Sequence, residues 1–346
     1  MTKDKDIIKR IVIFLASLFA VTYTYEFAIL YPQWKVVGSI GALNTAAVML
    51  FPALCVLLTR TVTKEGFNDC MLNPNFVKGK IRYYVGAWVF PPLFAILGAL
   101  IYFMIFRSEF SPDLEYYVGV LSKQGAAVSV SGLRTALIGS VFSGLVFSPI
   151  LNVVTCFGEE WGWRAYLQPR LSKLLGPIPA VFVTGAVWGL WHLPLTIMGH
   201  NYGLGYPGYP VTGIISMCIF CVILGISFAY ITFRTGSVWP AVIAHGSVNG
   251  FASIGIYFTK NGGNPFVGPS VTGIIGGIPL IIMAVFALVR LLKDTGEVPE
   301  VIEARPLIPD GAFRTQIREA QMPMPEVKDE TAVDASDASE GKNNGQ

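Results

Sequence analysis

The sequence predicts an all-α fold, a polytopic bundle of about eight transmembrane helices. Of its 346 residues, 53% are hydrophobic and only 14% are charged, whereas soluble domains carry about 25% charged residues. The apolar residues gather into runs near the roughly 20 residues that a helix needs to cross a bilayer. We therefore expect an integral, multi-pass membrane protein, in the cell membrane if the host is a prokaryote.

The first apolar run follows a basic segment that resembles a signal peptide. Lys3, Lys5, Lys9 and Arg10 precede the run, but no A-x-A-like cleavage site follows it, so we expect an uncleaved first helix. The segment 158–173 is expected to continue the fourth span as an amphipathic helix. The eight candidate spans lie near 11–31, 40–59, 83–106, 133–157, 178–197, 211–232, 237–257 and 272–292.

Successive loops alternate between a high and a low content of basic residues, and this alternation determines the expected orientation in the membrane. The N-terminal segment and the loops near 60–82 and 158–177 are rich in Lys and Arg, while the loop near 198–210 has none. Basic loops stay on the cytoplasmic side of a membrane. Both termini should therefore be cytoplasmic, as eight spans require. The basic residues form no stripe, so we expect membrane lipids and no nucleic acid as partners.

The last segment differs in composition from the rest. Residues 293–346 hold six Lys or Arg against twelve Asp or Glu, with several prolines. Such a segment cannot bury enough apolar surface to fold alone. We expect a disordered polar tail at 293–346 after a membrane-embedded domain at 1–292.

Two adjacent carboxylates stand where the fourth apolar run ends, in Gly158-Glu159-Glu160-Trp161-Gly162-Trp163-Arg164. An unpaired charge at membrane depth costs about 2.5 kcal/mol or more. On a helix, Glu160 and Arg164 are spaced i,i+4 and can pair, while Glu159 points about 100° away. The pair could thus divide into a structural acid and a working base. The alternative is an interfacial salt-bridge cluster that only caps the helix.

Two of the three histidines lie in later apolar runs. Pro194 should break the helix just after His192, which suggests a polar, hydrated cavity; the alternative is a core histidine bonded to a carbonyl. His245 and Asn249 share one helix face by their i,i+4 spacing, and two such donors suit a developing oxyanion. Alternatively, the two side chains could have only a structural role and form hydrogen bonds between helices. His200, in a Gly-, Tyr- and Pro-rich loop, is not expected to be catalytic.

The three elements together resemble the CAAX protease and bacteriocin-processing (CPBP, or Abi) family of intramembrane endopeptidases. The resemblance covers roughly residues 130–255. It rests on Glu159-Glu160-x-x-x-Arg164, Trp188-x-x-x-His192 and His245-x-x-x-Asn249, in that order on successive hydrophobic segments. The family commonly has Phe where this chain has Trp188, which we interpret as a conservative change at a packing position.

The resemblance implies a role for each site residue. Glu159 would be the general base that activates a water, and His192 would assist it and transfer the proton. His245 and Asn249 would hold the oxyanion, and Glu160 and Arg164 would be the supporting pair.

Metal use stays open. Two histidines and a carboxylate could make an open zinc site, in which case Glu159, His192 and His245 would be the ligands. However, the sequence contains no His-Glu-x-x-His motif, and Asn249 is a poor zinc ligand. We favour a glutamate-activated water without bound zinc and commit to no cofactor.

The leading functional hypothesis is an intramembrane endopeptidase that cuts a membrane-bound peptide near the cytoplasmic face. The substrate would be a lipidated, CAAX-like peptide or another short peptide. A proton-coupled transporter could use the same carboxylates and imidazoles as a relay, although we find no inverted repeat. A non-catalytic membrane scaffold is the third hypothesis.

Overall fold

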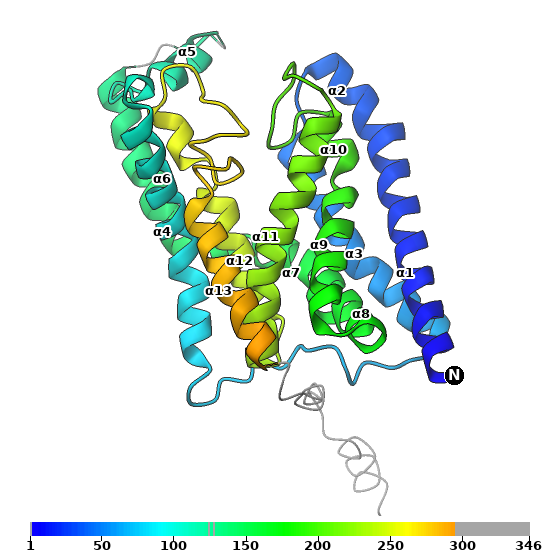
Figure 1. Ribbon diagram of the computed structural model, residues 1–346. Helices are drawn as coiled ribbons and strands as arrows, with labels where there is room; N and C mark the ends of the chain where they lie inside the picture. Colours follow the sequence, from blue (N-terminus) through cyan, green and yellow to red (C-terminus); the bar gives the residue numbers. More distant parts are fainter. Residues whose placement is uncertain (1, 124, 127–128, 295–346) are drawn as a thin grey trace, which may run out of the picture. The chain divides into compact units, whose positions relative to one another are not determined.

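The computed structural model describes residues 2–123, 125–126 and 129–294 (Figure 1). The chain divides into two compact units, Met1–Leu307 and Ile308–Gln346, and every described residue lies in the first. Helices make up the regular structure of the described residues, which contain isolated bridges but no named strand. The predicted tail lies almost entirely outside the described residues. The helices are α1 (Thr2–Tyr25), η1 (Glu26–Leu30), α2 (Tyr31–Val37), α3 (Ala42–Thr63), α4 (Ile81–Ile105), η2 (Arg107–Glu109), α5 (Glu115–Lys123), α6 (Val130–Leu151), α7 (Val153–Glu160), η3 (Trp161–Leu167), α8 (Gln168–Leu175), α9 (Pro177–Trp191), α10 (Leu193–Ile197), α11 (Val211–Thr235), α12 (Trp239–Phe251), η4 (Ile254–Phe258) and α13 (Ile278–Asp294).

The all-α, polytopic prediction is confirmed, with an approximate number of spans. Among the described residues, six helical segments are long and apolar enough to cross a membrane. The predicted fifth span is a shorter apolar helix, α9, which ends at Trp191 and is followed by α10. The predicted eighth span corresponds to α13, which has 17 residues and begins at Ile278 rather than 272. The chain is therefore an integral membrane protein with several membrane-spanning helices.

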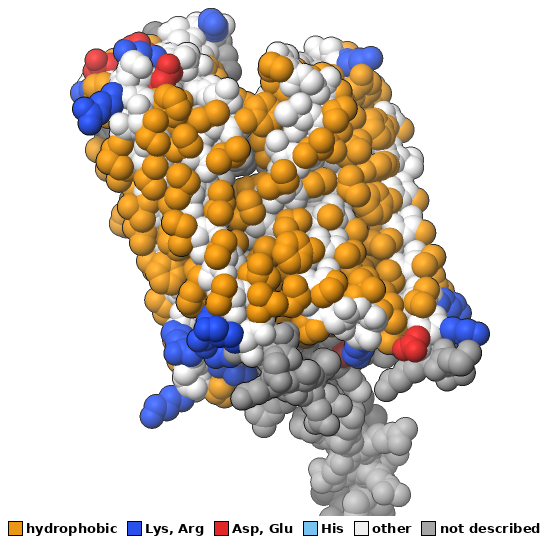
Figure 2. Space-filling model, viewed as in Figure 1, with side chains coloured by type: hydrophobic (Ala, Val, Ile, Leu, Met, Phe, Trp, Pro, Cys, Tyr) orange, Lys and Arg blue, Asp and Glu red, His pale blue; other side chains and the backbone are white. Residues whose placement is uncertain are grey.

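The surface has the distribution of side chains that a bilayer requires. Figure 2 shows hydrophobic side chains over the middle of the molecule, with Lys and Arg gathered toward its two ends. The start of α1 and the end of α13 lie at the same end of the bundle (Figure 1). This arrangement agrees with an even number of crossings, while the cytoplasmic assignment of that end stays a prediction from the basic loops.

At two prolines, the backbone carbonyl that loses its helical hydrogen bond accepts one from a side chain of another helix. Pro194 cannot donate a hydrogen bond to the carbonyl of Leu190, and the Tyr23 hydroxyl of α1 donates to that oxygen at 2.6 Å. Pro149 likewise frees the carbonyl of Leu145, which accepts a 2.7 Å hydrogen bond from Nε1 of Trp88 on α4. Backbone groups at membrane depth must be satisfied within the protein, so these bonds hold the breaks near the candidate site.

Close contacts at glycine bring the site-bearing helices together. A methyl group at Gly185 of α9 would lie 2.7 Å from Cα of Val222 on α11. A methyl group at Gly162 of η3 would lie 2.6 Å from Cβ of Pro52 on α3. Small residues let the backbones of two helices approach closely. Such packing matters in a membrane, because the hydrophobic effect does not drive helices together in lipid. The site-bearing segments are thus fixed by backbone packing.

An ion-pair cluster lies beyond the end of α3, at the same end of the bundle as the N-terminus. Glu65 accepts 2.7 Å hydrogen bonds from Arg170 and from the Tyr166 hydroxyl, and its carboxylate lies 3.3 Å from Nε of Arg10. Burial alone would raise the pKa of Glu65, but the hydrogen bond and charge of Arg170 and the Tyr166 hydroxyl lower it overall. The cluster ties α1, the loop after α3 and α8 together.

The segment after Glu160 is helical, as predicted, but its first part is not an α-helix. Residues Trp161–Leu167 form the π-helix η3, and the α-helix α8 follows. Single π-helical turns are rare and occur frequently at functional sites. Here the π-helix carries Arg164, the predicted partner of Glu160.

Candidate active site

Of the two adjacent carboxylates, Glu160 has the more extensive contacts with ionisable side chains. Its Oε2 lies 3.1 Å from Nε of Arg164, the i,i+4 ion pair expected from the sequence. Its Oε1 lies 2.9 Å from Nδ1 of His245 on α12. Glu160 and Arg164 are fully buried. Glu160 therefore links two ionisable side chains, Arg164 and His245, and each of its oxygens lies against one of them.

Glu159 has a different environment, as its 100° offset on the helix predicts. Its Oε2 accepts a 2.7 Å hydrogen bond from Nε1 of Trp188 on α9. The Trp188 ring also lies under the Arg164 guanidinium, with 4.3 Å between Cζ and the ring centroid. The interpretation of Trp188 as a packing position was incomplete, because its N–H contacts the candidate base. A phenylalanine at this position has no such donor.

His245 and Asn249 lie on the same helix, but they contact different neighbours. A carboxylate can only accept, so Nδ1–H of His245 donates to Glu160. The His245 ring lies 5.5 Å from the Trp188 ring, centroid to centroid. Nδ2 of Asn249 lies 3.6 Å from Sγ of Cys156, one helical turn before the Glu pair. Asn249 is exposed as a residue, whereas His245 is buried.

His192 lies at the proline break that the sequence predicts. It caps the end of α9, and its Nδ1 lies 2.9 Å from the Trp188 carbonyl. A carbonyl oxygen can only accept, so the proton belongs on Nδ1, and Nε2 of the neutral ring carries a lone pair. His192 is thus both a histidine bonded to a carbonyl, as the alternative hypothesis held, and a potential proton acceptor.

The sequence predicts no catalytic role for His200, yet the structure brings it close to His192. Its ring stacks on that of His192 with centroids 5.9 Å apart and an interplanar angle of 5°. The loop after α10 folds back to make this contact, because the amide of His200 donates to the carbonyl of Leu195 at 2.9 Å. Nothing in the local residue pattern signals this fold-back.

The structure therefore brings together the side chains of the three separated stretches, 159–164, 188–192 and 245–249. Trp188 is central, since its N–H bonds Glu159, its ring lies under Arg164, and its centroid lies within 6 Å of both His192 and His245. Chemically, the arrangement combines Glu159, which accepts from the Trp188 N–H, with Glu160, which lies between Arg164 and His245. Such a division separates a group that can accept a proton from groups that orient it.

The same residues do not make a three-ligand metal site in this arrangement. Within the described part of the chain, no group of three His, Cys, Asp or Glu side chains lies close enough to hold a metal ion. Of the suggested ligands, Glu159 is bonded to Trp188, and His245 uses Nδ1 for Glu160. We therefore derive no chemical step through a metal.

Comparison with known protein families supports the sequence resemblance. Residues 141–251 match the family described as type II CAAX prenyl endopeptidase Rce1-like. The matched region contains all six candidate site residues and agrees with the resemblance to the CPBP family. No curated protein shows significant similarity to the chain. The match indicates, in general terms, an endopeptidase of the CAAX type, which is a peptide hydrolase.

Proposed function

We propose that this chain, a member of the CPBP family, hydrolyses a peptide bond of a membrane-associated substrate with a water activated by Glu159. The substrate would be a prenylated, CAAX-like peptide or another short membrane-bound peptide. The cleaved bond would lie near the cytoplasmic face.

One observation carries the proposal, the unequal engagement of the two carboxylates. Glu160 has a charged or hydrogen-bonding partner at each oxygen, the ion pair with Arg164 at Oε2 and the hydrogen bond from His245 at Oε1, and it cannot readily accept a proton without breaking that ion pair. Glu159 accepts on Oε2 from the Trp188 N–H, and that hydrogen bond leaves its Oε1 outside. A general base must be oriented yet keep a lone pair for the proton it takes. Glu159 meets both requirements.

The proposed reaction begins with proton transfer from water to the Glu159 carboxylate. The water oxygen attacks the scissile carbonyl carbon, and the carbonyl π electrons move onto its oxygen. When the C=O bond re-forms, the C–N bond breaks, and the leaving nitrogen takes the proton from Glu159. His192 would assist this transfer, because its Nε2 carries a lone pair when Nδ1 donates to the Trp188 carbonyl.

His245 and Asn249 would stabilise the negative charge on the carbonyl oxygen. Asn249 is an exposed residue, and its amide makes a long contact of 3.6 Å to Sγ of Cys156, so a substrate oxygen can compete for its N–H. His245 would donate from Nε2 when its ring is protonated, with the Glu160 carboxylate supplying the counter-charge. Donors aimed at a developing oxyanion are commonly worth about 3 kcal/mol each in catalysis.

The test is cleavage of a quenched, prenylated peptide by the purified full-length protein and its Glu159→Gln variant. The proposal predicts that Glu159→Gln loses turnover while retaining the thermal unfolding transition of a folded protein. Glu115→Gln provides the control, because Glu115 is an exposed glutamate at the start of α5, and it should retain full activity. Turnover that persists in Glu159→Gln would reject the assigned base. Proton-coupled flux in liposomes without any peptide cleavage would instead favour the transporter hypothesis.

A further inference from the structure

The third histidine of the chain has no part in the proposed mechanism, yet it lies directly against the site. His200 follows α10, and its ring stacks on that of His192 with 5.9 Å between the centroids and 5° between the planes. Offset parallel aromatic rings attract one another at centroid separations of about 4.5–7 Å. The face of one imidazole is therefore packed against the face of the other.

The end of α10 places His200 in this position. The helix ends at Ile197, and Gly199 adopts the left-handed conformation with a φ of +93°. The amide of Gly199 donates to the carbonyl of Thr196 at 3.0 Å, and the amide of His200 donates to that of Leu195 at 2.9 Å. These two bonds form the Schellman motif, in which glycine is the usual residue at the left-handed position. The backbone of His200 is therefore fixed against α10.

The residues after His200 anchor the loop to other parts of the bundle. Tyr202 is buried, and its ring stacks on that of Phe266 with centroids 5.3 Å apart and an interplanar angle of 14°. Nδ2 of Asn201 lies 3.5 Å from Sδ of Met217 on α11. The loop lies at the end of the bundle opposite the N-terminus (Figure 1). His200 therefore reaches the site from that end, on a segment that is held by several contacts.

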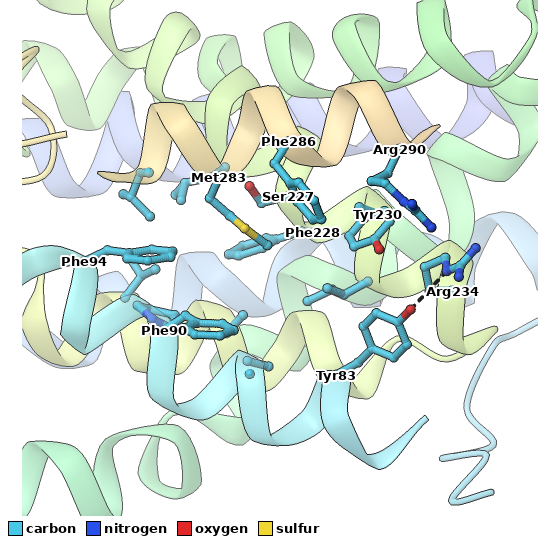
Figure 3. A pocket seen from close by; sticks show the side chains of 18 of the residues that line it. Tyr83, Phe90, Phe94, Ser227, Phe228, Tyr230, Arg234, Met283, Phe286 and Arg290 are labelled. Atoms are coloured by element: carbon cyan, nitrogen blue, oxygen red, sulfur yellow. Dashed lines mark hydrogen bonds between the residues drawn. The ribbon is translucent and has the colours of Figure 1, made fainter. Parts of the chain in front are cut away.

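The two site histidines differ in what holds their rings. His245 donates to the Glu160 carboxylate at 2.9 Å, and its aromatic neighbour Phe228, 5.9 Å away between centroids, lines a cavity of about 510 Å³ (Figure 3). His192 instead donates to a neutral acceptor, the Trp188 carbonyl, at 2.9 Å. Hydrogen bonds between neutral groups are weaker than those to a charged group. The orientation of His192 therefore depends more on the rings that pack against it.

We propose that His200 is a positioning residue, whose stack keeps the Nδ1–H of His192 on the Trp188 carbonyl and so leaves Nε2 to take the proton. The Trp191 ring contacts His192 from another direction, with 4.7 Å between centroids and an interplanar angle of 79°. Rotation of the His192 ring out of its plane would lose the stack together with the hydrogen bond. This role rests on the proposed function, because it requires His192 to assist the proton transfer.

The first test observes the tautomer of His192 and needs no turnover. The chain contains three histidines, so nitrogen NMR of the full-length protein with isotope-labelled histidine gives few signals, and His192→Gln assigns those of His192. At neutral pH, the unchanged protein should carry the His192 proton on Nδ1 alone. In His200→Ala, the released ring should exchange between its two tautomers, and the shifts of its two nitrogens should move toward each other. His200→Phe keeps a flat ring and should restore the original shifts.

Leu204→Ala is the matched control for this measurement. Leu204 is an exposed side chain of the same loop, so its truncation removes apolar volume and leaves both stacked rings in place. The His192 shifts should stay unchanged in this variant. The His245 signals are an internal reference, because that ring is held by Glu160. Unchanged His192 shifts in a folded His200→Ala protein, or tautomer exchange in Leu204→Ala, would overturn the proposal.

The second test measures cleavage of the prenylated peptide by the same variants. His200→Ala should lower kcat about fivefold with little change in KM, because the stack orients a proton acceptor and does not contact the substrate. His200→Phe should recover most of the lost kcat. An equal loss of kcat in His200→Phe would overturn the proposal, since it would point to the ring nitrogens of His200 instead of the stack. Absence of cleavage by the unchanged protein would contradict the proposed function, while the NMR shifts would still decide whether His200 holds the His192 ring.

Discussion

Replacing Trp188 by Phe is the most direct test of how the site holds Glu159, the proposed base. The substitution removes the N–H that donates to Glu159 at 2.7 Å. It keeps an aromatic ring beside the Arg164 guanidinium, whose Cζ lies 4.3 Å from the Trp188 ring. The expected change is therefore centred on the carboxylate of Glu159, together with a loss of packing volume.

The size of the effect follows from the energy of the lost hydrogen bond. A hydrogen bond to a charged group contributes about 1.5–3 kcal/mol, and one pKa unit corresponds to about 1.4 kcal/mol. A donated hydrogen bond favours the charged form of a carboxylate. Its loss should move the acidic limb of the pH dependence of kcat/KM upward by about one to two pH units. Below that limb, the variant should be slower than the unchanged protein at the same pH.

The assay is the pH profile of peptide cleavage, and Trp191→Phe is its control. Trp191 lies on the same helix, is equally buried, and donates its Nε1–H to Thr22 at 2.9 Å rather than to a site carboxylate. Both variants should lower the Tm by similar amounts, because both remove the same volume. Only Trp188→Phe should shift the acidic limb. An unmoved limb in Trp188→Phe, or the same shift in both variants, would refute the reasoning.

Three further predictions concern stability. Glu160→Gln should lower the free energy of unfolding by about 3–5 kcal/mol, because it disrupts a buried ion pair. Thermal unfolding should show a smaller loss of stability for Glu159→Gln. Equal losses in the two variants would contradict the division of roles between the two carboxylates. The pKa of Glu65 is lowered in the folded state, so its contribution is present above its unfolded pKa of about 4.3 and is lost as the pH falls through the folded value. Glu65→Gln should therefore flatten the loss of Tm on acidification, and an unchanged acid dependence would exclude this contribution. Gly185→Ala should destabilise by about 1–3 kcal/mol through overpacking, whereas Gly139→Ala on α6, where an added methyl meets nothing within 4 Å, should unfold like the unchanged protein.

Local spacing was enough to predict the contacts that lie within one helix. The i,i+4 relation of Glu160 and Arg164 predicted their ion pair, and it holds although η3 is a π-helix there. Pro194 likewise predicted the break at His192, since proline removes a donor wherever it stands in a helix. Hydropathy located the spans, but it misplaced the start of α13, because the apolar residues 272–277 form turns before the helix.

Contacts between helices could not be predicted in the same way. That His245 bonds Glu160 rather than Glu159 depends on the rotation and register of α12 against α7, which no spacing within either segment determines. The approach of Trp188 to Glu159 has the same origin, and it turned a residue that we interpreted as packing into a hydrogen-bond donor. The contact of His200 with His192 depends on a loop that folds back over α10.

These interhelical contacts also explain why the chain keeps two adjacent carboxylates at membrane depth. A single carboxylate could not both neutralise Arg164 and His245 and remain available to accept a proton, because each buried ion pair must stay intact to offset its desolvation. With two, Glu160 pairs with Arg164 of η3 and accepts from His245 of α12, and Glu159, the proposed base, accepts from the Trp188 N–H. Since neighbouring residues on a helix point about 100° apart, adjacency itself directs the two carboxylates to different partners. The doubled glutamate is thus the shortest sequence that can supply both a fixed countercharge and the separate base that we propose from one helical turn.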